Sequence, residues 1–172
     1  MEAHKGSPFP KVDVKTFWRT LSERVTGVTI VTARDELGPA GFLALSAAHV
    51  TADPPTMLVS VDKRTSALAT ILSSGHFAVN YLPAGADGVA DAFSGKTGLS
   101  GANRFVEGQW DTLVTGAPVF KEALGAFDCV VDDVILRGET SIVIGTAVAT
   151  TVDSSRSPLI FFRGKLRSDL VG

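Results

Sequence analysis

Apolar residues recur at helical spacing between positions 14 and 25, so that one face would carry Val14, Phe17, Trp18, Leu21 and Val25. Asp13 stands just before this stretch, and its side chain suits the N-terminal cap of a helix. We therefore predict a helix that begins after Asp13, ends at Gly27 and turns Trp18 toward the core. The polar, proline-interrupted residues 1–12 predict a flexible N-terminal arm, followed by one domain over 13–172.

Most of the remaining pattern predicts β-strands. Apolar and β-branched runs fall at 28–32, 57–61, 76–82, 126–136, 142–152 and 159–162. Residues 41–50 are expected to return as one strand after a turn at 35–39. Two further helices are predicted, one at 86–93 and one at 65–74 with an inward face of Ala67, Leu68, Ile71 and Leu72. Strands joined mainly by turns favour a mainly β fold, an antiparallel barrel with peripheral helices, over alternating βαβ units.

Composition narrows the possible chemistry. The 172 residues hold 16 Lys and Arg against 18 Asp and Glu, a formal charge of −2, and the basic residues do not cluster as nucleic-acid binding requires. One cysteine and three histidines without an HExxH pattern argue against disulfides and a metal site. Cys129 alternates with Phe127 and Val131, which indicates a buried small side chain. With neither a membrane span nor a signal peptide predicted, we expect a cytoplasmic protein.

Two neighbouring segments suggest a ligand site. Residues 41–55 are rich in small side chains, which let a flat ligand lie against the backbone. The residues Lys63, Arg64, Thr65 and Ser66 precede or open a predicted helix, where N–H groups, hydroxyls and positive charge suit a phosphate. The alternative is that Thr65 only caps the helix, since caps of this kind are common.

The order of several motifs resembles a known family. The matching pieces are Phe17, residues 26–32, the stretch from Gly41 to Asp53-Pro54-Pro55, residues 73–80, Phe93-Ser94-Gly95 closing on Arg104-Phe105, residues 116–119, residues 141–145 and residues 158–164. Together they resemble the short-chain flavin reductases, which have the FMN-binding split-barrel fold. The resemblance covers most of the chain, from about Phe17 to Arg167.

This resemblance implies a homodimeric enzyme that transfers a hydride from NADH or NADPH to FMN or FAD, often for a separate monooxygenase. The flavin ring would lie near Leu45, Ser46 and Ala47. The phosphate would be held by Ser46 and by the loop that contains Val61, Asp62, Lys63, Thr65, Ser66 and Ala67. Arg104 and Phe105 would belong to the side where the nicotinamide enters, and Phe162 would pack near the site. No side chain is expected to act as a nucleophile or general base, because the flavin carries the chemistry.

Departures from the family pattern leave two alternatives open. Leu43, Ala48 and His49 stand where relatives commonly have hydroxyl residues. Thr140 stands where many relatives carry a histidine associated with the nicotinamide. One alternative is a flavin-dependent reductase of a metal centre such as a cob(II) corrinoid, and the other is a flavin-binding protein without enzymatic activity.

Overall fold

The computed structural model describes residues 8–169. Its helices in this range are α1 (Val14–Leu21), α2 (Ser66–Ser74) and α3 (Asp87–Ser94), with a short 3-10 helix η1 (Gly101–Arg104). Its strands are β1 (Thr26–Gly27), β2 (Thr29–Asp35), β3 (Gly38–Ala44), β4 (Ala48–Ala52), β5 (Pro55–Asp62), β6 (His76–Tyr81), β7 (Trp110–Thr112), β8 (Pro118–Phe120), β9 (Gly125–Arg137), β10 (Thr140–Val152), β11 (Ile160–Phe162) and β12 (Lys165–Arg167).

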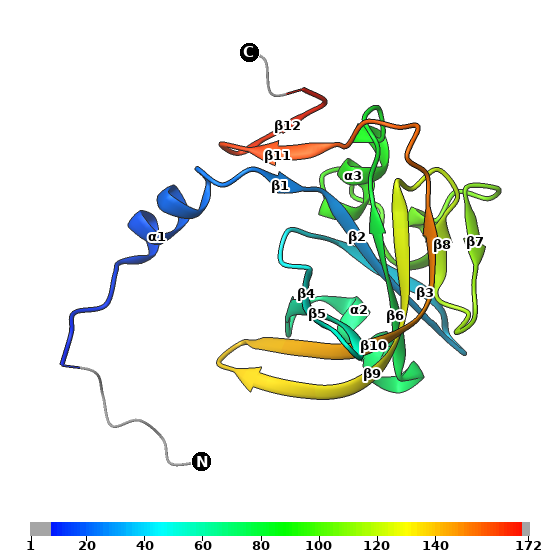
Figure 1. The fold of residues 1–172 in the computed structure, drawn as a ribbon, viewed down its shortest axis with the longest axis horizontal. Coiled ribbons are helices and arrows are strands. Elements are labelled where there is room, and N and C mark those ends of the chain that lie inside the picture. Colours follow the sequence, from blue (N-terminus) through cyan, green and yellow to red (C-terminus); the bar gives the residue numbers. More distant parts are fainter. Residues whose placement is uncertain (1–7, 170–172) are drawn as a thin grey trace.

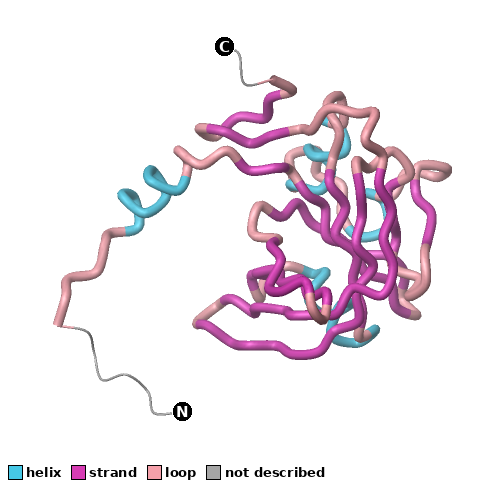
Figure 2. Tube along the Cα trace, in the orientation of Figure 1, coloured by secondary structure: helices cyan, strands magenta, loops and turns pink. Residues whose placement is uncertain are grey.

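An antiparallel sheet with the order β3-β2-β6-β9-β10-β5-β4 forms the body of the described chain. Two smaller sheets, β1-β11-β12 and β7-β8, accompany it (Figure 1). The helices lie at the periphery of this β structure (Figure 2), with α2 packed against β2 and β3. The predicted mainly β, antiparallel fold with peripheral helices is confirmed.

One predicted strand is wrong. Residues 41–50 do not run as a single strand, because the chain leaves β3 after Ala44 and starts β4 at Ala48. At this break the Ser46 hydroxyl donates to the Ser60 carbonyl at 3.0 Å and accepts the Ser60 N–H at 3.2 Å. These two bonds hold the bend at residues 45–47 against β5, which is separated from β3 in the sheet by four strands.

Helix α1 begins as predicted, but it ends at Leu21 rather than at Gly27, and it does not face the core. Asp13 caps it, because its Oδ1 accepts the Thr16 N–H at 3.0 Å. No residue of α1 is buried, and Trp18 is 61% exposed, so the prediction of a core-facing Trp18 is wrong. Figure 1 shows the helix extending away from the body of the molecule. The apolar spacing of α1 predicts that one face of the helix is buried, but it does not show whether this chain or another molecule buries that face.

Helix α2 is buried on the predicted face with one exception. Ala67, Leu68 and Ile71 are buried, whereas Leu72 is 50% exposed and was wrongly predicted to point inward. Gly75 ends the helix in the left-handed conformation, and its N–H donates to the Ile71 carbonyl at 2.9 Å. This end turns the chain directly into β6, so that α2 connects β5 to β6 across one face of β2 and β3.

The core has two main parts. The first surrounds the fully buried Phe77 and Cys129 between α2 and the large sheet. The second joins α3 to the two-stranded sheet through Phe93, Phe105 and Trp110, whose ring centroids lie 4.9–5.3 Å apart. Trp110 lies in β7 and belongs to this aromatic cluster.

A buried amide ties the small β7-β8 sheet to the large sheet. Asn80 of β6 donates through Nδ2 to the Ile30 carbonyl at 3.1 Å, and its Oδ1 accepts the Phe120 N–H at 2.8 Å. Because these partners belong to β2 and β8, the side chain of Asn80 fixes the small sheet against the large one. Within residues 8–169 no helix has both the length and the apolar character needed to cross a membrane.

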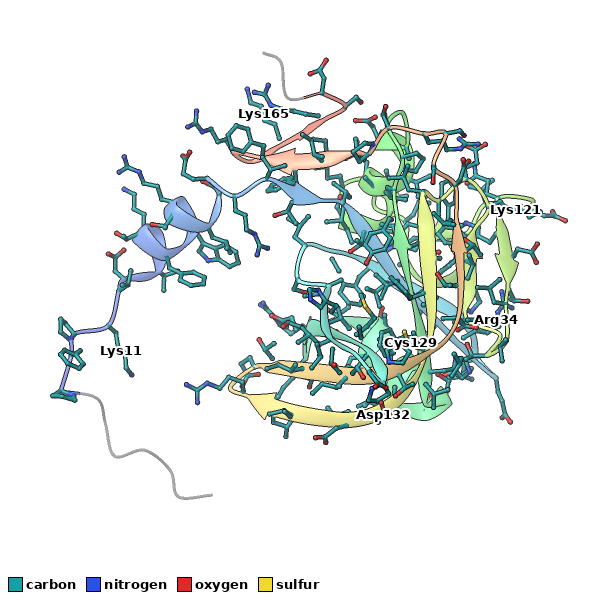
Figure 3. The ribbon with its side chains drawn as sticks, in the orientation of Figure 1. Lys11, Arg34, Lys121, Cys129, Asp132 and Lys165 are labelled. Atoms are coloured by element: carbon teal, nitrogen blue, oxygen red, sulfur yellow. The ribbon has the colours of Figure 1, made fainter. Side chains whose placement is uncertain are left out.

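Cys129 is expected to resist thiol reagents in the folded protein. Its side chain is fully buried in the body (Figure 3), and burial is the main reason that its pKa rises to about 12, with a smaller contribution from Asp128. Because the thiolate is the reactive form, the native thiol is almost wholly unreactive near neutral pH. Labelling with an aromatic disulfide reagent, with and without denaturant, checks this, and rapid labelling of the native protein would contradict it.

Candidate functional site

A polar cavity of about 440 Å³ opens where β3, α2, α3 and η1 meet. Its apolar wall comes from Phe42 and Leu43 of β3 and from Phe93 of α3. Hydroxyl groups and guanidinium groups line the rest of the wall, which consists of Arg64, Thr65, Ser66, Ser94 and Arg104. The cavity therefore combines an apolar surface with positive charge and hydroxyl donors, which suits a ligand that has a flat apolar part and an anionic end.

The start of α2 presents donors to this cavity. Thr65 is the N-cap residue and has extended backbone geometry, but its side chain makes no capping hydrogen bond. The first N–H groups of a helix have no carbonyl partner within it, and the helix dipole adds partial positive charge there. Thr65 and Ser66 thus bring hydroxyls to an end of α2 that is suited to bind an anion.

Arg104 joins the glycine-rich loop to β3. Its Nε donates to the Leu99 carbonyl at 2.9 Å, and its Nη1 donates to the Gly41 carbonyl at 3.0 Å. Gly41 also lets the Phe93 ring pack closely on β3, because a Cβ there would lie 2.8 Å from that ring and 2.9 Å from the Val31 carbonyl oxygen. These contacts hold one guanidinium in the cavity wall opposite the start of α2.

Carboxylates accompany the other two cations at the site. Asp62 accepts Arg64 Nε at 2.9 Å and Nη2 at 2.8 Å, and it also accepts the Arg64 N–H at 2.9 Å. Lys63 Nζ lies 3.7 Å from Glu139 Oε1, across the end of the β5–β10 ladder. Lys63 does not line the cavity itself, whereas Arg64 does. The positive charges of Lys63 and Arg64 are therefore partly neutralised by the neighbouring carboxylates.

Acidification is expected to leave the Asp62–Arg64 pair intact far into the acid range. The hydrogen bonds from Arg64 lower the pKa of Asp62 from 3.8 to about 2 in the folded protein. Because the folded pKa is depressed, the pair's contribution to stability is fully present above pH 3.8 and is lost as the pH falls through about 2. NMR titration of the Asp62 carboxyl carbon measures this, and Arg64→Gln should raise its midpoint; an unchanged midpoint would contradict the assignment.

The bend at residues 45–47 borders a second, smaller cavity of about 90 Å³. Leu45 lines it together with Trp18 of α1 and Phe161 of β11. Phe162, which was predicted to pack near the site, has the Arg163 guanidinium 5.0 Å from its ring centroid. Phe161, one position earlier on the same strand, lines this cavity with Leu45 and Trp18.

The structure brings together some of the predicted site residues and separates others. Thr65, Ser66 and Arg104 share the larger cavity, although Arg104 was predicted on the nicotinamide side. Thr140 pairs with Asp62 in the ladder and so lies beside Lys63. Val61 and Ala67 are fully buried behind the loop, and the Phe105 ring packs in the aromatic cluster. Sequence analysis did not select Phe42, Leu43, Phe93 or Ser94 for the site.

Comparison with known proteins places this site in a family. The sequence model of the flavin reductase like domain matches residues 21–168, which is most of the chain. The chain belongs to this family. The match spans the cavity residues and both halves of the β9–β10 hairpin, so the predicted family resemblance is confirmed.

Individual flavin reductases agree with this assignment along nearly their whole length. The FMN reductase (NADH) RutF of Ancylobacter novellus is 33% identical over 153 residues, covering 89% of this chain and 83% of the relative. A flavin reductase structure from Haemophilus somnus 129PT superposes with a TM-score of 0.86 at 29% identity, covering 91% and 99% of the two chains. BorF, the flavin reductase component of a bacterial two-component tryptophan halogenase, superposes with a TM-score of 0.83 at 28% identity, covering 90% and 97%.

The residues of this flavin reductase fit the group that the family implies. A flavin has a flat apolar ring and, in FMN, a terminal phosphate. Phe42 and Leu43 supply the apolar wall, whereas Thr65, Ser66 and Arg104 supply the donors that a phosphate accepts. The donor set of the cavity therefore matches the anionic end of FMN.

Proposed function

We propose that the protein is an NADH-dependent FMN reductase whose flavin phosphate binds in the 440 Å³ cavity. The observation that carries this proposal is the meeting of Thr65 and Ser66 with Arg104 across that cavity. The name of the Ancylobacter relative, an FMN reductase that uses NADH, supports the choice of both molecules. FAD and NADPH are the less favoured choices.

Each residue near the cavity has a proposed task. The hydroxyls of Thr65 and Ser66 and the first N–H groups of α2 donate to the phosphate, and Arg104 neutralises part of its charge. Lys63 adds positive charge from the adjacent loop. Leu45, Ser46 and Ala47 offer the backbone of the bend to the flavin ring, and Ser46 keeps that bend in place through Ser60.

The reaction depends on orientation rather than on a reactive side chain. When bound, the flavin supplies the redox chemistry by accepting a hydride from the nicotinamide. The bend at residues 45–47 and the start of α2 would hold the flavin and orient it for hydride transfer. Thr140, which stands where many relatives carry a histidine associated with the nicotinamide, would be the residue of the β9–β10 turn to test for a contact with the dinucleotide.

A comparison of FMN with riboflavin tests the phosphate assignment. Riboflavin has the same ring and ribityl chain but no phosphate, so it should bind at least about tenfold more weakly if charge-assisted hydrogen bonds hold the phosphate. Fluorescence titration of the protein with each flavin measures both dissociation constants. Equal affinities would remove the phosphate from this cavity.

We further propose that the reduced flavin serves an oxygenase. BorF, which has the same fold, is the reductase component of a two-component halogenase, and this supports a similar arrangement here. An anaerobic screen compares FMN, FAD and a cob(II) corrinoid as acceptors, with NADH and NADPH in parallel. Preferred reduction of FMN supports the proposal, whereas corrinoid reduction that outpaces free reduced FMN would favour a metal-centre reductase.

We also propose that the protein acts as a homodimer in the cytoplasm, where NADH is available. Val14, Phe17 and Trp18 of α1 are 54–73% exposed, and all five residues of β4 are exposed. Apolar surface of this kind normally marks an interface, and a second copy is the commonest partner. Sedimentation analysis should give about twice the chain mass of 18.0 kDa, and Trp18→Asp should shift the protein toward the monomer. A monomeric wild type would contradict this.

A further inference from the structure

The cations beside the phosphate cavity already have partners before a ligand arrives. Arg64 is held by both oxygens of Asp62, and Arg104 donates to two backbone carbonyls. Lys63 is different, because its partner Glu139 lies 3.7 Å away and the two side chains are 41% and 82% exposed. The Lys63–Glu139 pair is therefore the loosest of these contacts and the one that a phosphate displaces most easily.

The backbone keeps Glu139 in this position. The Lys63 N–H donates to the Glu139 carbonyl at 2.9 Å, and Thr140 pairs with Asp62 in the next step of the ladder. Gly138, with a φ of 59°, makes the tight turn between β9 and β10 that presents Glu139 to β5. The backbone of Glu139 thus lies next to that of Lys63, so the Glu139 carboxylate can reach the Lys63 ammonium.

We propose that Glu139 lowers the affinity for flavin by occupying Lys63, so that reduced flavin is released rather than retained. This inference rests on the proposed function. A phosphate that binds Lys63 has to break the ion pair between Lys63 and Glu139. The free energy lost with that ion pair offsets part of the free energy gained from the interaction of Lys63 with the phosphate. Loss of the phosphate is helped by the return of Lys63 to Glu139. Glu139 acts here as a positioning residue, through Lys63.

Glu139→Gln tests this inference, because it removes the charge and keeps the size of the side chain. The variant should bind FMN about two- to fivefold more tightly, the range expected for an exposed ion pair. Riboflavin affinity should stay unchanged, because riboflavin has no phosphate to compete for Lys63. The dissociation rate of FMN should fall by a similar factor, and the gain should shrink at high salt.

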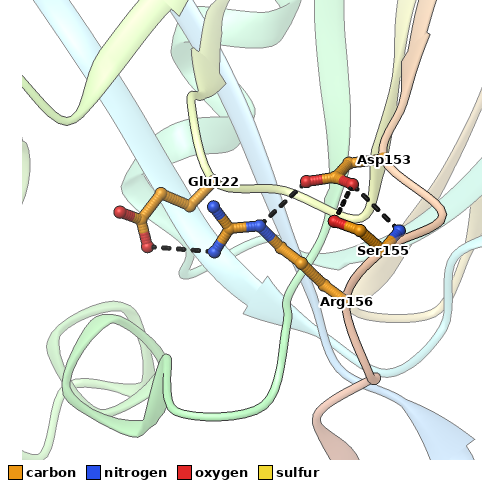
Figure 4. A network of polar contacts seen from close by, with 4 residues as sticks. All are labelled: Glu122, Asp153, Ser155 and Arg156. Carbon is orange, nitrogen blue, oxygen red and sulfur yellow. Dashed lines mark hydrogen bonds and ion pairs between the residues drawn. The ribbon is translucent and has the colours of Figure 1, made fainter.

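A matched control comes from a second exposed glutamate. Glu122 is 63% exposed and pairs with Arg156, which also binds Asp153 in a network formed by the segments after β8 and β10 (Figure 4). Glu122→Gln makes the same change in net charge within an ion pair that belongs to other segments of the chain. It should leave the FMN affinity unchanged, and an equal gain in this variant would show a general effect of net charge and overturn the inference.

The Lys63→Gln background completes the test. If Glu139 acts through Lys63, Glu139→Gln should add little FMN affinity once Lys63 has been replaced. A full gain in that background would overturn the inference and assign direct repulsion of the phosphate to Glu139. Unchanged FMN affinity in the single variant would also overturn it while leaving the proposed function intact. Failure of the wild type to bind FMN at all would instead contradict the proposed function.

Discussion

Replacing Arg104 with alanine is expected to weaken FMN binding about ten- to a hundredfold, the effect of losing about 1.5–3 kcal/mol from a charged hydrogen-bonding group. The change removes a guanidinium from the cavity wall. It also removes the bonds from Nε to the Leu99 carbonyl and from Nη1 to the Gly41 carbonyl, which tie the glycine-rich loop to β3. Fluorescence titration with FMN measures the loss.

Two further variants show whether the loss of affinity is specific to the Arg104 guanidinium. Arg104→Lys keeps the charge but loses the planar fork that reaches two carbonyls, so it should recover only part of the affinity. Arg34→Ala removes an exposed arginine of β2 that lines a different cavity, and it should leave FMN binding unchanged. If Arg104→Ala binds FMN as tightly as the wild type, Arg104 does not contribute to the phosphate site.

Phe77→Ala is expected to lower the free energy of unfolding by about 3–5 kcal/mol, which is typical of a large aromatic side chain removed from a packed core. Phe77 is fully buried in β6, and its ring is packed so closely that a Cβ at Gly145 would lie only 2.7 Å from it. Neither Val79 nor Val143, which share this core, can extend to fill the space. Urea denaturation followed by circular dichroism measures the change.

An exposed leucine serves as the control for this experiment. Leu37 lies in the turn between β2 and β3 and is 96% exposed, so Leu37→Ala should change stability by less than about 0.5 kcal/mol. A small effect of Phe77→Ala, comparable with that of Leu37→Ala, would contradict the packing described for the first part of the core.

The sequence predicts those elements that local chemistry determines. Asp13 and Gly75 bound their helices through contacts within a few residues, so their roles are visible in the pattern. The β9–β10 hairpin follows from two long β-branched runs around a Gly138 turn. The break at residues 45–47 was not predictable in this way, because it depends on the hydrogen bonds between Ser46 and Ser60, which belong to different segments.

In the candidate site, too, the features set by neighbouring residues were predictable, and those set by contacts between distant segments were not. Thr65 and Ser66 were identifiable because hydroxyl residues at a helix start have a known chemistry. Their meeting with Arg104 depends on how η1 packs on β3, and the sequence places these residues far apart. Glu139 stood out even less, since an exposed glutamate in a turn is common. Only the register that sets it opposite Lys63 shows its relation to the site.

Anaerobic rapid mixing of NADH with the protein and FMN tests the central claim most directly. The visible absorption of the oxidised flavin is followed with time, with a protein-free sample of NADH and FMN alongside. If the protein is an NADH-dependent FMN reductase, this absorption should be lost many times faster with the protein than without it, at a rate that saturates with NADH. Equal rates in the two samples, with FMN shown to be bound, would contradict the claim.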